Sequence, residues 1–493
     1  MVTRKDKELA IENFKRFYSS FRKYQREAIE KACELLEKRK YLFLSAPTGI
    51  GKSAINMSLL LVNGGYYVTG LLSLQDQICK DFQAEEIYDI RGKENYECRR
   101  GGKCRCVRDK CELCVYKYEK AKALSSFVTV TNIFWIMSNI NSLKKKHLCV
   151  IDEAHNLPEI LVNYGRVTLS EKNCFSIFPI IRRCRIEDIP SYLYEYANNL
   201  ADFGDDERAS KLLNLAKRIE VALQTKVIDV VKSTKREIIP LYADRIFEKF
   251  DFAERFIFSS ATINPDYMIK ELGLNKKDCA IIKIPSLFPP ERRPIVALPI
   301  CDFDLKHQEE NAELIVSVCR KIIEKHKGEK GIIFVPGYRY YDYFKDMDRV
   351  IFLEENRRDE ILREWMESDD DKVLVGVKLE EGLDLKYDLC RFAIIVKAPF
   401  PDVSDLRVKF RLEKMKQWKW FYSLAENLLV QAYGRLCRAE DDFGILYILD
   451  KKAIALLKRK TIPKWVKSAI IKFEPSQLTL GGDTNAYQPE RNN

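Results

Sequence analysis

The sequence predicts an α/β fold built from two domains that each contain a mostly parallel β-sheet. Short apolar, β-prone runs alternate with helical segments in about the first 150 residues. The same alternation returns after about residue 330, so a second sheet is expected. With 493 residues, 46% of them apolar and 32% charged, the chain is long enough for several domains and is excluded from the disordered and collagen-like classes.

The first half of the chain supplies the elements of the first sheet. Residues 21–40 are expected to form a helix, because their apolar positions recur at helical spacing and the segment ends in a basic run. The next segment, YLFLSAPTGIGKSAINMSLLL, predicts a strand, a Pro/Gly turn and a helix. Further strands are expected at 65–72 and 148–151. Such uniformly apolar strands are typical of parallel sheets that are covered on both faces.

The second half shows the same alternation of strands and helices, after a segment with a different pattern. Strands are expected within 330–338, 372–377, 392–401 and 443–450. Between about Pro158 and Glu248 the chain shows amphipathic helical stretches and little strand signal, which predicts a helical insertion. The polar tail from about Gln477 is expected to fray.

Charge and cysteine content restrict the class of protein. The 84 Lys and Arg exceed the 73 Asp and Glu, so the net charge of +11 permits a polyanionic partner without requiring one. The 15 cysteines are an odd number, and five of them fall between Cys98 and Cys114, which does not fit a disulfide framework. The N-terminus has no apolar signal segment, and the uncharged stretch Ser53–Gln75 is broken by Asn and Gly. We therefore expect a cytoplasmic protein without a membrane span.

A phosphate-binding loop is the most specific motif. Its spacing is met by Ala46, Pro47, Thr48, Gly49, Ile50, Gly51, Lys52 and Ser53, with Ala in place of the usual first Gly. Small residues let the backbone amides turn toward an anion at the start of a helix. Lys52 is expected to reach the β and γ phosphates, and the Ser53 hydroxyl to bind Mg²⁺. The alternative is an accidental Gly-rich turn between a strand and a helix, which the flanking strand and helix disfavour.

An acidic pair follows the predicted strand in CVIDEAH. Asp152 is the candidate for the metal-side carboxylate, and Glu153 the candidate for positioning and deprotonating the attacking water. Taken alone, these acids could equally cap a helix N-terminus. The combination with the phosphate loop favours a nucleoside triphosphatase.

Together these motifs resemble those of the superfamily 2 helicases. The sequence DEAH restricts the resemblance to fewer members of that superfamily, and it implies that His155 lies beside the nucleotide. Ser259, Ser260, Ala261 and Thr262 resemble the coupling motif of that superfamily, and residues 431–438 (QAYGRLCR) resemble its arginine-finger motif. Arg435 and Arg438 stand one helical turn apart, so both are expected to reach a γ-phosphate held by the other domain, although such a pair can also be a solvated helix face.

The resemblance implies further nucleotide contacts. Gln25 is similar to the upstream glutamine that reads the base. Gln431 belongs to the arginine-finger motif and is expected on the ATP side. Glu381, Gly382 and Asp384 resemble the motif that lines the cleft between the domains, although acids in such a loop could equally be capping groups.

The clustered cysteines indicate metal ligands, because thiols in a Gly- and Arg-rich loop are not ordinary core residues. Four thiolates suit zinc or an iron–sulfur cluster, and spacing alone does not separate the two. Here the resemblance sharpens to the XPD/DinG family of iron–sulfur DNA helicases, and it implies a [4Fe–4S] cluster with Cys98 and Cys114 as first and fourth ligands. Cys104 and Cys111 are preferred for the other two, with Cys106 as the alternative.

The family likeness implies two RecA-like motor domains, with a cluster insertion and a helical arch insertion in the first. The expected boundaries are 1–95, 119–157 and 249–265 for the first motor domain, 96–118 for the cluster domain, 158–248 for the arch and 266–493 for the second motor domain. Between Arg91 and Lys110 there are eight Lys or Arg and three acids, which suits a nucleic-acid strand, although a solvated basic loop would look the same.

The expected function is that of a monomeric, nucleoid-associated, ATP- and Mg²⁺-dependent 5′–3′ helicase on single-stranded or forked DNA, in repair or fork processing. Two alternatives stay open. One is a zinc- and nucleic-acid-binding ATPase switch that does not separate strands. The other is an RNA-directed helicase, because backbone contacts do not distinguish the sugars. The protein partners are unknown from the sequence.

Overall fold

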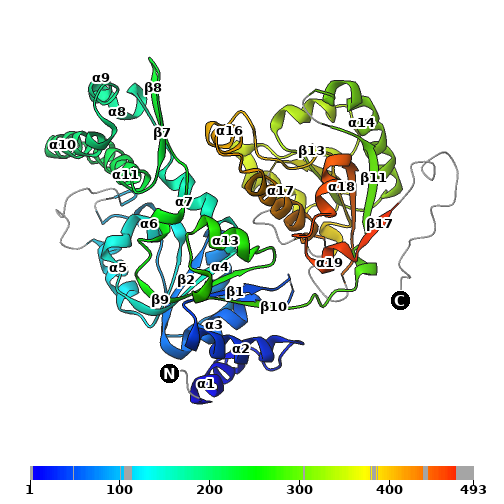
Figure 1. Cartoon of the computed structure of the whole chain (residues 1–493), viewed down its shortest axis with the longest axis horizontal. Helices are drawn as coiled ribbons and strands as arrows, with labels where there is room; N and C mark the ends of the chain where they lie inside the picture. Colours follow the sequence, from blue (N-terminus) through cyan, green and yellow to red (C-terminus); the bar gives the residue numbers. More distant parts are fainter. Residues whose placement is uncertain are drawn as a thin grey trace. The chain divides into compact units, whose positions relative to one another are not determined.

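The computed structural model divides the chain into two compact units (Figure 1). The first comprises Met1–Ser45, Gly51–Ile284 and Asp405–Lys414, and the second comprises Ala46–Ile50, Pro285–Ser404 and Met415–Asn493. The structure describes residues 4–47, 49–70, 72–99, 101–104, 114–303, 306–377, 379, 385, 387–436 and 442–472. Each unit is built on a seven-stranded sheet in which every strand pairing is parallel. The predicted α/β fold class is thereby confirmed.

The sheet of the first unit has the strand order β10-β1-β9-β5-β2-β4-β3. Its strands are β1 (Tyr41–Ser45), β2 (Gly65–Thr69), β3 (Ile87–Asp89), β4 (Val128–Asn132), β5 (Lys146–Asp152), β9 (Ala253–Ser260) and β10 (Cys279–Lys283). The helices of this unit outside its insertion are α1 (Arg4–Lys15), α2 (Gln25–Lys38), α3 (Lys52–Asn63), α4 (Leu72–Asp81), α5 (Val115–Ser125), α6 (Ile133–Asn139), α7 (Leu157–Gly165) and α13 (Pro265–Glu271). All five residues of β2 are buried, as its apolar run predicted, and all five of β4 are buried as well.

Parallel register brings the ends of three strands to one edge of this sheet. Ser45 at the end of β1 pairs with Ser260 at the end of β9, and Asp152 at the end of β5 pairs with Ser259. The carboxyl edge of a parallel sheet is where ligands bind in open α/β folds. Three predicted site segments therefore meet at this edge.

The end of the first unit lies further along the chain than the expected boundary at residue 265. The last strand, β10, pairs with β1 through the register Tyr41↔Cys279 to Ser45↔Lys283, so the first unit extends to Ile284. The strand signal of CAIIK is short, and only its long-range partner assigns it to this sheet.

The insertion between α7 and β9 contains a three-stranded antiparallel sheet in addition to helices. Its order is β6-β8-β7, with β6 at Val167–Ser170, β7 at Val227–Val231 and β8 at Lys235–Pro240. The helices are α8 (Glu171–Cys174), α9 (Phe178–Ile181), α10 (Ile189–Asp202), α11 (Asp206–Ala222) and α12 (Asp244–Phe247), with α10 and α11 packed side by side. The sequence favoured helix through VIDVV, but α11 ends at Ala222 and this β-branched run forms β7.

The sheet of the second unit has the order β13-β14-β12-β15-β16-β11-β17. Its strands are β11 (Ile295–Cys301), β12 (Gly331–Phe334), β13 (Val350–Phe352), β14 (Val373–Gly376), β15 (Phe392–Ile395), β16 (Ile445–Asp450) and β17 (Ile470–Lys472). The helices are α14 (Gln308–Lys325), α15 (Arg358–Glu367), α17 (Trp418–Tyr433), α18 (Lys451–Leu457) and α19 (Lys464–Lys467). All four strands expected in this half are present. No helix in the described part of either unit is long and apolar enough to cross a membrane.

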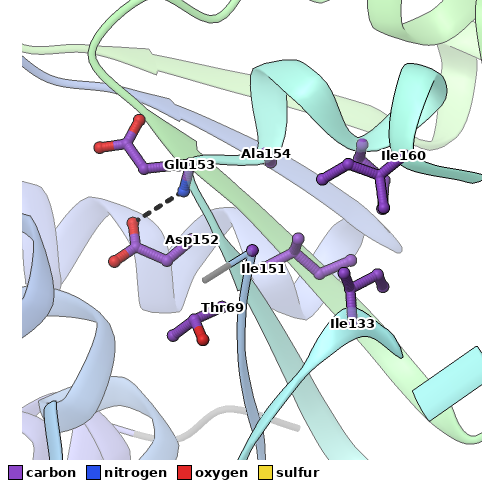
Figure 2. Close-up of a pocket in the computed structure, with 9 residues that line it drawn as sticks. Thr69, Ile133, Ile151, Asp152, Glu153, Ala154 and Ile160 are labelled. Carbon is purple, nitrogen blue, oxygen red and sulfur yellow. Dashed lines mark hydrogen bonds between the residues drawn. The ribbon is translucent and has the colours of Figure 1, made fainter. Parts of the chain in front are cut away.

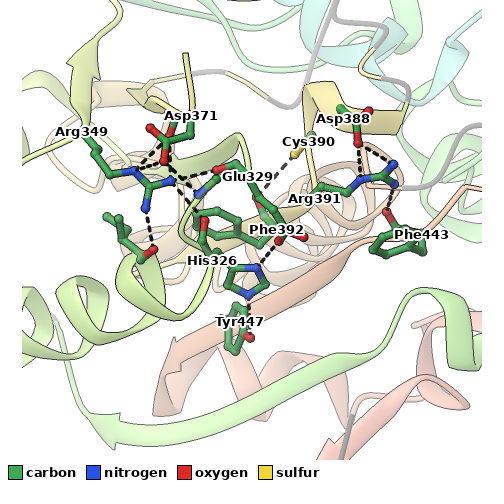
Figure 3. A network of polar contacts seen from close by, with 12 residues as sticks. His326, Glu329, Arg349, Asp371, Asp388, Cys390, Arg391, Phe392, Phe443 and Tyr447 are labelled. Carbon is green, nitrogen blue, oxygen red and sulfur yellow. Dashed lines mark hydrogen bonds and ion pairs between the residues drawn. The ribbon is translucent and has the colours of Figure 1, made fainter. Parts of the chain in front are cut away.

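A polar network fixes the amino ends of the strands in the second unit (Figure 3). The imidazole of His326 lies 2.7 Å from a carboxylate oxygen of Glu329 and 3.0 Å from the hydroxyl of Tyr447, and it stacks on the ring of Phe392. Arg349 pairs with Asp371 at 2.9 Å and donates to the backbone carbonyl of His326 at 3.1 Å. These bonds hold the loops that lead into β12, β14 and β15 at the edge opposite the strand ends.

One helix from the second half of the sequence belongs to the first unit. This helix, α16 (Leu406–Glu413), contributes Arg411, which is fully buried and forms a two-bond ion pair with Glu271 at 2.7 and 2.8 Å. Arg407 of the same helix pairs with Glu159 of α7 at 2.5 Å. Since removal of one partner would leave a buried charge alone, these pairs fix α16 in place.

We predict that Glu271→Ala lowers the free energy of unfolding by about 3–5 kcal/mol, because Arg411 would then be buried without its carboxylate. Urea unfolding followed by circular dichroism measures the loss. A double variant, Glu271→Leu with Arg411→Met, should recover much of the stability, because both charges leave together. Glu248→Ala, which breaks the exposed pair with Arg245, is the control and should leave the midpoint nearly unchanged. Equal effects of Glu271→Ala and Glu248→Ala would contradict the assignment.

Candidate functional site

The amino end of α3 is shaped to receive an anion. Gly51 precedes Lys52 with a φ of 82°, a left-handed conformation that glycine adopts without strain. A Cβ atom at Gly51 would lie 2.4 Å from the side-chain nitrogen of Gln25, so the amide of Gln25 rests directly against this turn. The backbone amides and dipole of the 12-residue helix that follows favour a phosphate group here.

Asp152 ends β5 in a buried position with two hydrogen-bond donors. The hydroxyl of Tyr67 donates to Asp152 Oδ2 at 2.9 Å, and the backbone N–H of Glu153 donates to Oδ1 at 3.0 Å. Burial, together with the neighbouring Glu153 carboxylate, raises the pKa of Asp152 to about 6. Figure 2 shows Asp152 and Glu153 at one side of a small hollow that is lined on the other side by Ile133 and Ile160. A divalent cation bound at this position would offset the free-energy cost of burying the ionised Asp152 carboxylate.

Glu153 is held in a strained left-handed conformation, with φ of 49°, and faces three predicted site residues. Its carboxylate lies 4.0 Å from Lys52 Nζ and 3.3 Å from His155 Nδ1, and it accepts a hydrogen bond of 3.1 Å from Ser260 Oγ. Ser260 Oγ also lies 2.7 Å from His155 Nδ1 and accepts the backbone N–H of Thr262 at 3.2 Å. The predicted coupling motif is thus bonded directly to the DEAH motif.

Tyr67 is the residue of this site that the sequence did not reveal. It lies on β2, 85 positions before its partner Asp152, and desolvation together with that carboxylate raises its pKa well above the ordinary value. The neighbouring side chains of Ser53 and Asn56 also contact the hydroxyl. The only signal in the sequence was an aromatic pair, Tyr66 and Tyr67, inside an otherwise apolar strand.

The structure brings part of the predicted set together in the first unit. These residues are Gln25, Gly51, Lys52, Ser53, Asp152, Glu153, His155, Ser259, Ser260, Ala261 and Thr262. The loop residues Ala46, Pro47, Gly49 and Ile50 belong to the second unit, as do Gln431 on α17 and Arg435 just after it. The remaining predicted positions lie outside the described residues: Thr48, Cys106, Cys111, Glu381, Gly382, Asp384 and Arg438.

Three of the clustered cysteines are described. Cys98 opens a tight turn, in which its N–H donates to the carbonyl of Gly102 at 2.7 Å, and the Sγ atoms of Cys104 and Cys114 lie 3.8 Å apart. Burial opposes ionisation of Cys114, but the backbone N–H of Lys117 and the Cys104 thiol outweigh it, so its pKa is lowered. Among the described residues, which omit 105–113, no group of three or more His, Cys, Asp or Glu is placed to hold a metal ion.

Basic side chains converge beside this loop. Lys120 of α5 is half-buried, and its pKa is lowered by burial and by the nearby charges of Lys217 and Lys93, which come from two other segments. Tyr118, 60% exposed, lies one helical turn from Lys122, whose ammonium sits 4.4 Å from the Tyr118 ring centre. The three converging lysines suit the phosphate backbone of a nucleic-acid strand, and the exposed Tyr118 ring, on another face of α5, suits stacking with a base.

Comparisons with known proteins agree with this architecture. Residues 18–178 match the family model of the res subunit of type III restriction enzymes, and residues 319–469 match that of a helicase C-terminal domain. A solved XPD helicase superposes with a TM-score of 0.65 at 17% identity, covering 92% of this chain and 100% of that chain. The structure of S. tokodaii Xpd4 gives 0.63 at 17% identity, with the same coverage. The fold therefore matches the two RecA-like domains of these XPD structures.

Curated relatives are similar over shorter stretches. The Fanconi anemia group J protein homolog of Gallus gallus is 27% identical over 181 residues, which are 29% of this chain and 14% of that protein. A probable ATP-dependent helicase of Methanocaldococcus jannaschii is 26% identical over 225 residues, 40% of this chain and 34% of that protein. The match to the XPD/RAD3 helicase subunit of Saccharomyces cerevisiae factor IIH is 28% over 102 residues, 19% of this chain and 12% of that protein.

These matches span far less than two thirds of each curated relative. Together with the solved structures, they confirm the predicted resemblance to the XPD/DinG family: the chain is XPD-like in fold, and its second half matches a helicase C-terminal domain.

The position of Tyr67 leads to a prediction about metal binding. Tyr67→Phe should raise the Mg²⁺ concentration needed for half-maximal binding of a fluorescent ATP analogue by roughly tenfold, because a hydrogen bond to a charged group contributes about 1.5–3 kcal/mol. The matched control is Tyr66→Phe, since the Tyr66 hydroxyl donates to the carbonyl of Lys144 instead. Identical Mg²⁺ dependence in both variants would contradict a role for Tyr67 at Asp152.

Proposed function

We propose that this protein is an ATP-dependent DNA helicase or translocase that hydrolyses Mg²⁺-ATP when single-stranded DNA is bound. The observation that carries the proposal is the meeting of the α3 amino end with Lys52, Asp152, Glu153 and Ser260 at one edge of the first sheet. A phosphate-binding helix end, a buried metal-side carboxylate and a second carboxylate near the lysine are the parts that phosphoryl transfer requires.

Each residue has a proposed task in hydrolysis. Lys52 and the amides before α3 bind the phosphates, Ser53 and Asp152 hold Mg²⁺, and Glu153 orients the attacking water. Arg435 and Arg438 come from the second unit and stabilise the charge on the γ-phosphate, with Gln431, Glu381, Gly382 and Asp384 as further nucleotide contacts. The chain Glu153–Ser260–Thr262 links the state of the phosphate to the segment after β9.

DNA is the proposed substrate. Lys93, Lys120 and Lys217 converge, and relatives carry names such as ATP-dependent DNA helicase and DNA repair factor subunit. We propose 5′–3′ movement on single-stranded or forked DNA at the nucleoid, with residues 96–118 and the insertion at 158–248 guiding the strand. The working form is proposed to be a monomer, and the pathway to be repair or fork processing.

The cysteine loop is proposed to hold a metal centre. The pair Cys104 and Cys114 fits a shared site, since the two thiols lie 3.8 Å apart, and Cys98 with Cys111 or Cys106 would complete four ligands. A [4Fe–4S] cluster, which the family likeness implies, is the first candidate. Zinc is the second, because thiolates on one tetrahedral ion with Zn–S bonds of about 2.3 Å lie roughly 3.8 Å apart. Either metal centre would stabilise the loop that carries these cysteines.

The decisive prediction for hydrolysis concerns Lys52. Lys52→Ala should abolish Mg²⁺-ATP hydrolysis that single-stranded DNA stimulates in the unchanged protein, because the β and γ phosphates lose their cation. Phosphate release measured with and without an oligodeoxynucleotide tests this. Unchanged hydrolysis in Lys52→Ala would refute the proposal.

Competing strands in the same assay separate the alternatives. Stimulation by RNA that equals or exceeds stimulation by DNA would favour an RNA-directed helicase. Hydrolysis without unwinding of a forked DNA duplex would favour the ATPase switch.

The metal centre has its own prediction. Protein purified without added metal should be brown, with a broad visible absorption band that Cys98→Ser removes, and with about four iron atoms per chain. Cys279→Ser, at a cysteine outside the loop, is the control and should leave the colour unchanged. A colourless protein with one zinc per chain would support the zinc alternative.

A further inference from the structure

Arg293 of the second unit is buried in a cage of aromatic rings. It is 1% exposed, and its guanidinium carbon lies 4.7 Å from the ring centre of Trp465, 5.3 Å from that of Tyr433 and 5.4 Å from that of Phe288. Tyr433 and Trp465 stack on each other with their ring planes 17° apart. The guanidinium also donates to the hydroxyl of Ser286 and, at 3.4 Å, to the carbonyl of Phe288.

The backbone at Arg292 and Arg293 bonds to one residue of the arginine-finger motif and to one residue beyond it. The hydroxyl of Tyr433 donates to the carbonyl of Arg293 at 2.7 Å, and the N–H of Gly444 donates to the carbonyl of Arg292 at 3.0 Å. Tyr433 is the last residue of α17 and stands two positions before Arg435. Two adjacent carbonyl groups therefore hold Gly444 and the helix end that directly precedes Arg435.

The same cage contacts the phosphate loop. A Cβ atom at Gly49 would lie 2.3 Å from the Phe288 ring, so this ring rests on the backbone of the loop. Phe288 is itself held by Arg293 through its carbonyl and its ring face. Gly49, Phe288, Arg293 and Tyr433 thus form a continuous chain of contacts that ends beside Arg435.

Burial of a guanidinium is costly, and an apolar side chain of similar volume would fill a core position at lower cost. A cation between aromatic faces regains part of this cost and is restricted in orientation by the rings. These contacts suit a residue that sets the position of its neighbours.

We propose that Arg293 is a positioning residue for catalysis, which acts through Tyr433 to place Arg435. This inference rests on the proposed ATPase function. The step that Arg293 serves is γ-phosphate transfer, after ATP has bound.

A double-mutant cycle tests the proposal. Single-turnover hydrolysis of radiolabelled ATP, with enzyme in excess and single-stranded DNA present, is measured for Arg293→Met, Arg435→Ala and the double variant. Arg293→Met should lower the rate at saturating ATP by about tenfold, because a small misplacement of a catalytic group is enough for such a loss. In the Arg435→Ala background the same change should alter the rate by less than about twofold, because the two residues act in series.

Two further variants exclude a purely structural effect. Arg293→Lys keeps a cation between the rings and should recover a large part of the rate. Arg349→Met removes a partly buried polar network before β13 and β14 in the same unit and is the matched control. Any rate loss in Arg349→Met should be of equal size with and without Arg435.

The outcomes are distinct. An equal loss from Arg293→Met in both backgrounds, or no loss in either, would overturn the positioning role. Weaker binding of ATP with an unchanged rate at saturation would also overturn it, because Arg293 would then act on the phosphate loop through Phe288. Absence of hydrolysis in the unchanged protein would instead refute the proposed function itself.

Discussion

The parallel register of β1, β9 and β5 is the constraint on which the candidate site depends. It sets Ser45 opposite Ser260 and Asp152 opposite Ser259, so that the phosphate-loop strand, the DEAH strand and the coupling strand end at one edge. A one-residue slip in any of these pairings would turn the strand over and move its last side chain to the other face. The geometry of the candidate site is therefore a consequence of the packing of both faces of the sheet, which opposes such a slip.

Burial at this edge gives the carboxylates their properties. Asp152 is desolvated and lies beside Glu153, which raises its pKa to about 6, yet Tyr67 and the N–H of Glu153 hold it in one orientation. Glu153, by contrast, is turned by its left-handed backbone toward Lys52 and Ser260. Two adjacent acids thereby occupy different environments, which allows one to face a metal ion and the other a water molecule.

Local signals in the sequence were sufficient for the strands with strongly apolar runs, for the glycine turn before Lys52 and for the strand that ends at Asp152, because each of these features depends on residues close together in the chain. Features that depend on distant partners were not predicted. Tyr67 finds Asp152 85 positions later, and Arg411 finds Glu271 140 positions earlier. The strand β7 was read as helix, since only its pairing with β8 distinguishes a β-branched run from the end of a helix.

Two buried arginines hold their surroundings through different groups. Arg411 meets a carboxylate through two parallel hydrogen bonds, and such a fork allows a single orientation, so that α16 is locked to the first unit. Arg293 lies between ring faces that restrict its guanidinium, and its hydrogen bonds go to Ser286 and to the carbonyl of Phe288. The side chain of Arg293 thereby fixes its own backbone, and the carbonyl of that backbone accepts the hydroxyl of Tyr433. The placement of Arg435, two positions later, therefore depends on a side chain that does not contact it.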